Sequence, residues 1–208
     1  MITAYIPYQN IRFFSKLITD YVGENKKLRP FYHNFPSLLE FKKQIEEKAL
    51  DFTEEKRHIL VSSLKEQYAE VKTTPKVLKN IELLSKSNTF TITTGHQLSL
   101  FTGHLYFIFK IISVINTAKQ LAEKYPDKHF VPVYWMATED HDFEEINHFK
   151  TQNHIYSIDG KSGGAVGRIK VEKNNFIEEF EKEFKYNDFG KELIGWMKEA
   201  YAEGNTLA

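Results

Sequence analysis

One stretch, residues 88–147, constrains the fold most, because two strand-like runs flank a glycine-containing loop and a long apolar helix pattern. Residues 89–94 (TFTITT) are β-branched and aromatic, which is typical of a strand. Residues 130–137 (FVPVYWMA) are almost continuously apolar, which favours a parallel strand covered on both faces. Residues 104–124 predict a largely buried helix. Strand, loop, helix and strand in this order predict a right-handed βαβ unit of an open α/β sheet.

The flanking regions predict helices before this unit and mixed structure after it. Residues 1–87 contain helical patterns at 12–22, after Pro36, from a capping box of Asp51 and Glu54, and at 77–84. Short strands are expected at 148–152, 155–158 and 166–171, followed by two amphipathic helices between 175 and 201. We therefore predict a helical region (1–87), the first half of an α/β domain (88–147) and the start of a small α+β insertion (148–208), within which we expect the chain to be truncated.

Composition excludes several classes of function. Lys plus Arg equals Asp plus Glu, at 28 each, so nothing indicates nucleic-acid binding. The absence of cysteine excludes disulfides, thiolate metal ligands and a cysteine nucleophile. Neither a run of about 18 apolar residues nor a signal-peptide pattern is present, so we expect no membrane span and a cytoplasmic location.

Ligands of open α/β sheets bind beyond the carboxyl ends of the strands, and two polar segments follow the predicted strands. In the first, glycines allow close approach of a ligand and a helix N-terminus offers N–H groups to phosphate. Its candidate cofactor-binding residues are Thr94, Gly95, His96, Gln97, Thr102, Gly103 and His104. Residues 101–104 lack the first histidine of an H-x-G-H signature, and the loop matches neither a Walker A nor a G-x-G-x-x-G pattern. A capped helix start with surface histidines is the alternative.

The second segment, residues 138–148, is rich in carboxylates and imidazoles. Its candidate catalytic residues are Glu139, Asp140, His141 and Asp142. Composition favours a charged loop that caps the next helix, then a general base or amine-binding site, and last a metal site, because no stereotyped ligand spacing is present. Farther along, Arg168 follows a glycine-rich turn and could bind a carboxylate or phosphate, although an exposed arginine on a hairpin is the simpler interpretation.

Two strings are more specific than composition: TTGHQLSLFTGHLYFIFKIISVINTAKQL (93–121) and FVPVYWMATEDHDFEEINH (130–148). They resemble the bacillithiol cysteine-adding enzyme family, in which T-G-Q-Q-x-x-L-F-T-G-P-L-Y-x-x-x-K precedes F-V-P-V-F-W-x-A-x-E-D-H-D-x-x-E. The Gly-Gly-x-x-Gly-Arg-Ile stretch also fits this family. His96 stands where the family pattern has Gln and His104 where it has Pro, which weakens a catalytic role for either histidine.

The resemblance implies a Rossmann-like core similar to class I nucleotidyltransferases and synthetases, incomplete in this chain. It implies a ligase that joins cysteine to glucosaminyl malate, with ATP as cofactor and Mg²⁺ as a further candidate. Trp135, Asn147 and Arg168 are then candidate substrate-binding residues. A later coiled coil, absent from these 208 residues, could support a homodimer. Nucleotidyl or glycosyl transfer on the same fold and a non-enzymatic scaffold remain the alternatives, and we expect the 208-residue chain alone to be inactive.

Overall fold

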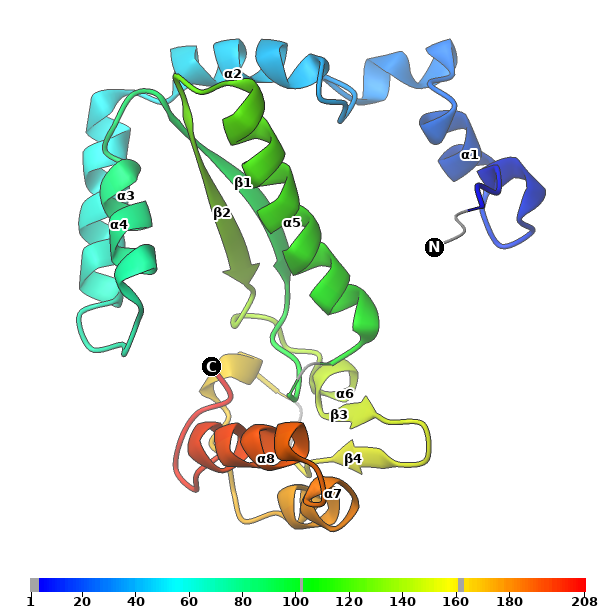
Figure 1. The fold of residues 1–208 in the computed structure, drawn as a ribbon, viewed down its shortest axis with the longest axis vertical. Helices are drawn as coiled ribbons and strands as arrows, with labels where there is room; N and C mark the ends of the chain where they lie inside the picture. Colours follow the sequence, from blue (N-terminus) through cyan, green and yellow to red (C-terminus); the bar gives the residue numbers. More distant parts are fainter. Residues whose placement is uncertain (1–3, 102, 161–162) are drawn as a thin grey trace. The chain divides into compact units, whose positions relative to one another are not determined.

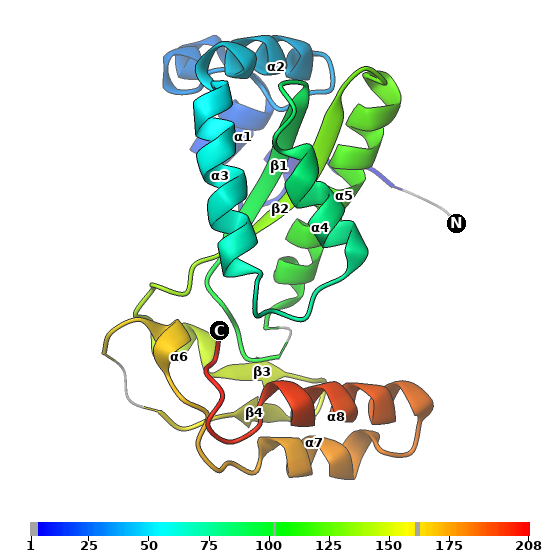
Figure 2. The ribbon, with the colours of Figure 1, turned by 90° about the vertical axis from the view of Figure 1, so that its left-hand side faces the viewer.

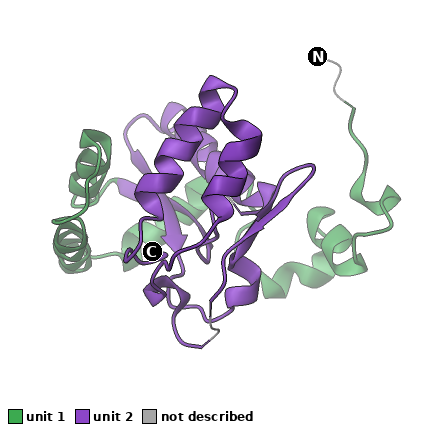
Figure 3. Cartoon of the chain, turned by 90° about the horizontal axis from the view of Figure 1, so that it is seen from below, with its two compact units in different colours: residues 1–88 green, residues 89–208 purple. Residues whose placement is uncertain are grey.

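A computed structural model describes residues 4–101, 103–160 and 163–208, which form two compact units (Figure 3). The first unit comprises residues 1–88 and the second residues 89–208. Each unit is described by itself below. The predicted start of a separate insertion at residue 148 stays a prediction.

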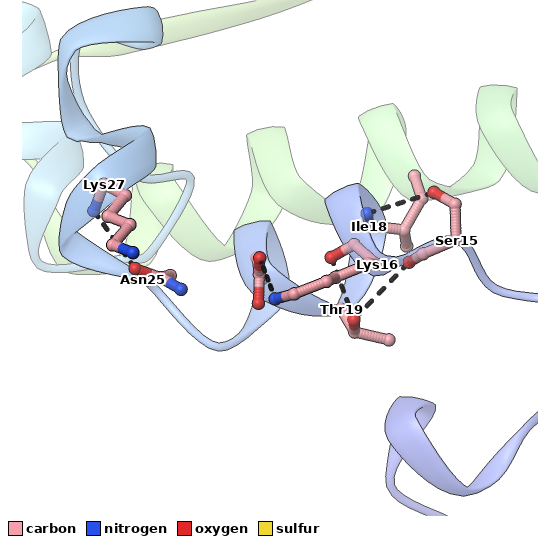
Figure 4. Close-up of polar contacts among 7 residues, drawn as sticks. Ser15, Lys16, Ile18, Thr19, Asn25 and Lys27 are labelled. Carbon is pink, nitrogen blue, oxygen red and sulfur yellow. Dashed lines mark hydrogen bonds and ion pairs between the residues drawn. The ribbon is translucent and has the colours of Figure 1, made fainter.

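All the named elements in the described part of the first unit are helices. Its elements are η1 (Tyr8–Asn10), α1 (Lys16–Val22), η2 (Lys26–Phe31), α2 (Glu40–Asp51), α3 (Glu54–Gln67) and α4 (Pro75–Leu83). Local sequence sets where these helices begin: the Ser15 hydroxyl accepts from the N–H of Ile18 at α1, and Asn25 accepts from Lys27 at η2 (Figure 4). Pro75 occupies the first turn of α4, where its missing N–H costs nothing.

The buried guanidinium of Arg57 joins α3 to the chain after α4. It donates to the carbonyl oxygens of Leu84 (3.0 Å) and Ser87 (3.2 Å), and it lies 5.0 Å from the ring centroid of Phe52. Burial lowers the pKa of this guanidinium. These bonds satisfy carbonyl groups at the end of α4 that have no partner within the helix.

The second unit contains the predicted βαβ arrangement: β1 (Thr89–His96), α5 (Leu105–Lys124) and β2 (His129–Met136). The two strands are parallel, with Thr89 opposite His129 and His96 opposite Met136. Figure 1 shows α5 lying along both strands, in agreement with its packing against each. Ring contacts between α5 and β2 support this packing, for example Phe107 with Tyr134 at 5.2 Å between centroids.

The rest of the second unit packs around a separate aromatic core. Its elements are α6 (Phe143–Ile146), the antiparallel pair β3 (His148–Lys150) and β4 (Ile155–Ser157), η3 (Val166–Arg168), α7 (Phe176–Phe184) and α8 (Asp188–Ala200). Figure 2 shows α7 and α8 side by side next to this hairpin. The buried cluster, which we call the aromatic core, consists of Leu98, Leu100, Phe143, Ile146, Phe149, Tyr156, Ile158, Val166, Phe176, Phe180, Ile194 and Met197.

Several local predictions were wrong. Residues 166–168 form the 3-10 turn η3 instead of a strand, because the N–H groups of Val166 and Gly167 donate to carbonyls of residues 140 and 138. Of the rest of the predicted strand, Lys170 makes only an isolated antiparallel bridge to Thr206. Thr53, not Asp51, caps α3, and Asp51 is instead the last residue of α2. The helix α5 is not largely buried: only Ala118 and Leu121 are buried among its residues.

Candidate functional site

The parallel pairing of β1 with β2 brings the two polar segments together at one edge of the sheet. His96 and Met136 are opposite each other at the strand ends. Beyond them, the N–H of Ala137 donates to the carbonyl oxygen of His96 at 3.1 Å, and the Tyr134 hydroxyl donates to the same oxygen at 2.9 Å. The segments that follow β1 and β2 therefore both begin at the carboxyl end of the sheet, where open α/β sheets bind ligands.

Gly95 allows this close approach. A Cβ atom at this position would lie 3.2 Å from both the Cβ and the carbonyl oxygen of Trp135. The Lys110 ammonium group, which comes from α5, donates to the Gly95 carbonyl oxygen. Thr94, half-buried, lies opposite Tyr134 in the register. Gly95 thus serves the packing of the strand ends, and its carbonyl is occupied by a lysine of this chain.

His96 forms a short chain of hydrogen bonds with a defined direction. Its Nδ1 lies 2.9 Å from the carbonyl oxygen of Gln97, which can only accept, so Nδ1 carries a proton. In the neutral ring, Nε2 is then an acceptor, and the Tyr106 hydroxyl at 2.7 Å donates to it. Burial, followed by the proximity of Tyr106, raises the pKa of Tyr134 on the adjacent strand.

Gln97 points into the protein. The residue is 6% exposed, and its side-chain Nε2 donates to the Glu145 carboxylate of α6. Its Oε1 is buried and has no hydrogen-bond partner among the described residues. A buried amide that bonds to α6 joins the first polar segment to the second.

The chain between β1 and α5 is held against the aromatic core. Leu98 and Leu100 are buried, and the N–H of Leu100 donates to the carbonyl oxygen of Ile146 at 2.8 Å. Gly103 has a φ of +55°, in the left-handed region that glycine adopts readily. Thr102 lies outside the described residues.

His104 is at the N-cap of α5, where its side chain makes no capping hydrogen bond. Its ring stacks on Tyr106, with 5.6 Å between centroids and 16° between planes. The ring of His148 on β3 stands edge-on to His104 at 6.1 Å. The structure thus gathers His104, Tyr106 and His148, of which we had singled out only His104.

In the acidic segment, residues 138–148, the side chains of Asp140 and Asp142 accept hydrogen bonds from N–H groups of the segment itself. Asp140 Oδ1 accepts from the N–H groups of His141 (2.7 Å) and Asp142 (3.4 Å), and lies 3.5 Å from the His141 ring. Asp142 caps α6 by accepting from the N–H of Glu145 at 3.3 Å, which agrees with the capping interpretation. The side chains of Asp140 and His141 remain 40% and 85% exposed, and Glu139 is exposed. Among residues 4–101, 103–160 and 163–208, no group of three His, Asp or Glu side chains is placed to hold a metal ion.

The three candidate substrate-binding residues have different surroundings. Trp135 is 62% exposed at the end of β2, so this strand is not covered on both faces as we predicted. Asn147 contacts His148, with 2.9 Å between Oδ1 and Nδ1. Arg168 is exposed on η3, which is held close to the acidic segment by a 2.9 Å hydrogen bond from Gly167 N–H to the Thr138 carbonyl. The backbone at Arg168 therefore follows a residue that is hydrogen-bonded to the acidic segment.

Several residues that shape this site were not predicted. The family pattern could have indicated three of them. Its part L-Y-x-x-x-K specifies Tyr106 and Lys110, and its last E specifies Glu145. Tyr201, whose hydroxyl accepts a hydrogen bond from the N–H of Phe101, lies 100 residues away along the chain. No local pattern could have indicated that contact.

The site combines several kinds of chemical group at one edge of the sheet. The exposed carboxylates of residues 139 and 140 suit a positively charged amine. Uncapped N–H groups at the start of α5, with His104, suit an anion. A site with both kinds of group can bind a substrate amine and a phosphate or carboxylate.

Comparison with known proteins identifies the family to which the chain belongs. All 208 residues match the family model described as "Bacillithiol biosynthesis BshC, N-terminal Rossmann-like domain". Relatives named "Putative cysteine ligase BshC" are 46% identical in Flavobacterium johnsoniae and 47% in Flavobacterium psychrophilum, each over 100% of this chain and 40% of the relative. A Bacillus cereus relative of the same name is 31% identical over 91% of this chain and 36% of its own length.

The chain therefore spans about 40% of the length of the Flavobacterium relatives. Within the described residues, no helix is both long and apolar enough to cross a membrane. The match over the whole chain, together with the parallel β1–α5–β2 unit, identifies the fold as an α/β fold of the Rossmann-like type. The chain belongs to the BshC family of bacillithiol biosynthesis proteins, of which it carries the N-terminal Rossmann-like domain.

Proposed function

We propose that this chain is the N-terminal part of a ligase that adds cysteine to glucosaminyl malate in bacillithiol biosynthesis. The observation that carries the proposal is the match of the complete chain to the BshC domain model and to relatives named as cysteine ligases. No feature of the described residues favours nucleotidyl transfer, glycosyl transfer or a scaffold role over this reaction. The cytoplasmic location and a homodimer formed through a later coiled coil remain predictions.

The acidic segment is proposed to receive the amine substrate. Asp140 and His141 are the best candidates, because both side chains are exposed and lie next to each other. A carboxylate beside an imidazole can hold an ammonium group and then accept its proton, which leaves the amine free to attack. Glu139 would add negative charge, whereas Asp142 uses one oxygen to cap α6. Trp135, Asn147 and Arg168 are proposed to line the remainder of the substrate site.

ATP is proposed as the cofactor, and the residues present fit it. The first-turn N–H groups of α5, the exposed His104 and the exposed Arg168 would hold its phosphates. Of the other cofactor candidates, Gly95, His96 and Gln97 would support the loop together with Thr94 of the strand, because the Gly95 carbonyl and the two side chains that follow it already form hydrogen bonds within the chain. Mg²⁺ would need only one or two carboxylates beside the phosphates. When bound, ATP would supply the leaving group that activates a carboxylate.

Complementation tests this proposal. The complete open reading frame is expressed in a host that lacks its own cysteine-adding enzyme, and cellular bacillithiol is measured. We expect the thiol to reappear, and failure of the full-length protein to restore it would refute the ligase assignment. The 208-residue chain should restore none.

Substitutions locate the site in the same assay. Asp140→Asn and His141→Ala should each lower thiol formation by about a hundredfold, as loss of a general base typically does. His58→Ala, on the exposed side of α3, is the matched control and should have no effect. Normal thiol levels in both site variants would show that the proton acceptor lies elsewhere.

A further inference from the structure

The backbone of Phe101, just before α5, has an unusual conformation. Its φ is +53°, in the left-handed region that side chains other than glycine seldom adopt. Such a conformation persists only where the surrounding structure holds it. Phe101 lies in the segment that joins β1 to α5, three residues before His104.

Residues from beyond position 148 hold Phe101 in two ways. Its ring packs against Phe149 and Phe180 of the aromatic core, at 5.1 and 5.8 Å between centroids. Its N–H donates to the Tyr201 hydroxyl at 2.5 Å. Ring packing fixes the side chain, whereas two hydrogen bonds orient the peptide group between Leu100 and Phe101: its N–H donates to Tyr201, and its carbonyl oxygen accepts from the N–H of Gly103 at 3.0 Å.

Tyr201 is itself firmly anchored. It caps the end of α8, where its N–H donates to the carbonyl oxygen of Met197 at 2.9 Å, and its ring stands edge-on to Phe176 at 5.4 Å. Burial raises the pKa of its hydroxyl above the ordinary value of 10, so the hydroxyl is neutral at physiological pH. A neutral, fixed hydroxyl is a suitable acceptor for a single backbone N–H.

We propose that Tyr201 is a positioning residue whose hydroxyl holds Phe101 in the left-handed conformation and thereby sets where His104 and the first turn of α5 begin. It acts through Phe101 and touches no reacting group. The consequence for catalysis rests on the function proposed above. The part of the chain after residue 148 then does more than connect two halves of a domain, since it shapes the loop at which the anionic group would bind.

Removal of one hydroxyl tests the proposal. Tyr201→Phe keeps the ring in the core and deletes only the acceptor. Tyr156→Phe is the matched control: Tyr156 is 1% exposed in the same core and its hydroxyl donates to Glu183, away from Phe101. Both variants of the 208-residue chain are compared with wild type by NMR, through the coupling constants and Cα shift that report the sign of φ at Phe101 and through its amide exchange.

We expect Tyr201→Phe to speed exchange of the Phe101 amide about tenfold, the effect of losing one ordinary hydrogen bond, and to remove its positive-φ signature. Signals of His104 and Leu105 should shift, whereas Tyr156→Phe should leave all of these unchanged. A Phe101 amide within about twofold of wild type in Tyr201→Phe, with positive φ retained, would overturn the proposal.

Wild type provides a second measurement that needs no variant to fold. A Phe101 amide that exchanges as fast as that of the exposed Asn153 would contradict the hydrogen bond itself. In the full-length protein, Tyr201→Phe should lower bacillithiol formation more than Tyr156→Phe does, and equal levels would overturn the positioning role. The NMR measurements use no substrate, so a wrong ligase assignment would leave them valid.

Discussion

The hydrogen bond between Gln97 and Glu145 joins the two polar segments. Swapping these two residues gives a direct test of that link. Gln97→Glu would place two carboxylates in contact at a position that is 6% exposed. The charge-assisted bond, worth roughly 1.5–3 kcal/mol, is lost. Repulsion between unit charges about 4 Å apart adds up to about 4 kcal/mol at an effective dielectric constant of about 20, reduced where the introduced carboxyl takes up a proton. We expect the free energy of unfolding at pH 7 to fall by roughly 3–5 kcal/mol.

Glu145→Gln should cost only about 1 kcal/mol, because the introduced amide oxygen can still accept from Gln97. The double variant Gln97→Glu/Glu145→Gln reverses donor and acceptor and should recover about half of the summed single losses, with a coupling energy of about 2–3 kcal/mol. Urea unfolding of the four proteins measures this cycle. The repulsion raises the pKa of the introduced carboxyl, so the loss in the single variant should shrink as pH falls toward about 4. A coupling energy below about 0.5 kcal/mol would refute a structural link between the segments.

Two further predictions concern a turn and a buried phenol. Gly103→Ala should lower the free energy of unfolding by roughly 2–4 kcal/mol, because φ is +55° and the new Cβ would lie 2.6 Å from the Ser99 Cβ. At Gly164, φ is +83° and a new Cβ would meet nothing within 4 Å, so Gly164→Ala measures the cost of the backbone conformation alone. An equal loss of stability in both variants would exclude a steric contribution at Gly103. Burial and Glu183 raise the pKa of Tyr156 to about 12, above its ordinary value of 10. Its contribution to stability is present below pH 10 and lost as pH rises through about 12, by at most about 2.7 kcal/mol, and Tyr156→Phe should flatten this decline in alkaline unfolding curves.

Local sequence patterns predicted the helices and strands well where each element depends on residues of its own segment. The β1–α5–β2 unit follows from strand propensity, and the break between α7 and α8 follows from Asn187, which caps α8 by accepting from the N–H of Gly190. The 3-10 turn at Val166 could not be predicted, because it depends on carbonyls of residues 138 and 140. The local sequence there, a β-branched residue followed by glycine, is as compatible with a strand as with a 3-10 turn.

The candidate site was predictable as a place but not as a set of contacts. Parallel pairing alone puts His96 next to the acidic segment, so strand order suffices for that inference. Which polar side chains face inward is decided by distant partners, as with Gln97 on Glu145 and Phe101 on Tyr201. We therefore predicted ligand contacts for polar residues of the family strings, although in the structure several of these residues form hydrogen bonds with one another.

The exposed side of α5 gives the sharpest disagreement between sequence pattern and structure. Leu105, Ile108, Phe109 and Ile112 recur at the spacing of one helical face, which predicts a core-facing stripe. In the structure all four are exposed, Phe109 by 61%. If the pattern were right for this chain, Phe109→Gln would cost roughly 3–5 kcal/mol, as for a large core side chain.

The structure predicts a different result. An exposed ring contributes little, so Phe109→Gln should change the free energy of unfolding of the 208-residue chain by less than about 0.5 kcal/mol. Leu121→Ala, at a fully buried position of the same helix, is the matched control and should cost about 2–5 kcal/mol. Urea denaturation compares the two. A loss above about 1.5 kcal/mol in Phe109→Gln would mean that this stripe is covered in solution. If a second copy covers it, the loss should depend on protein concentration, whereas covering by the same chain should give no such dependence.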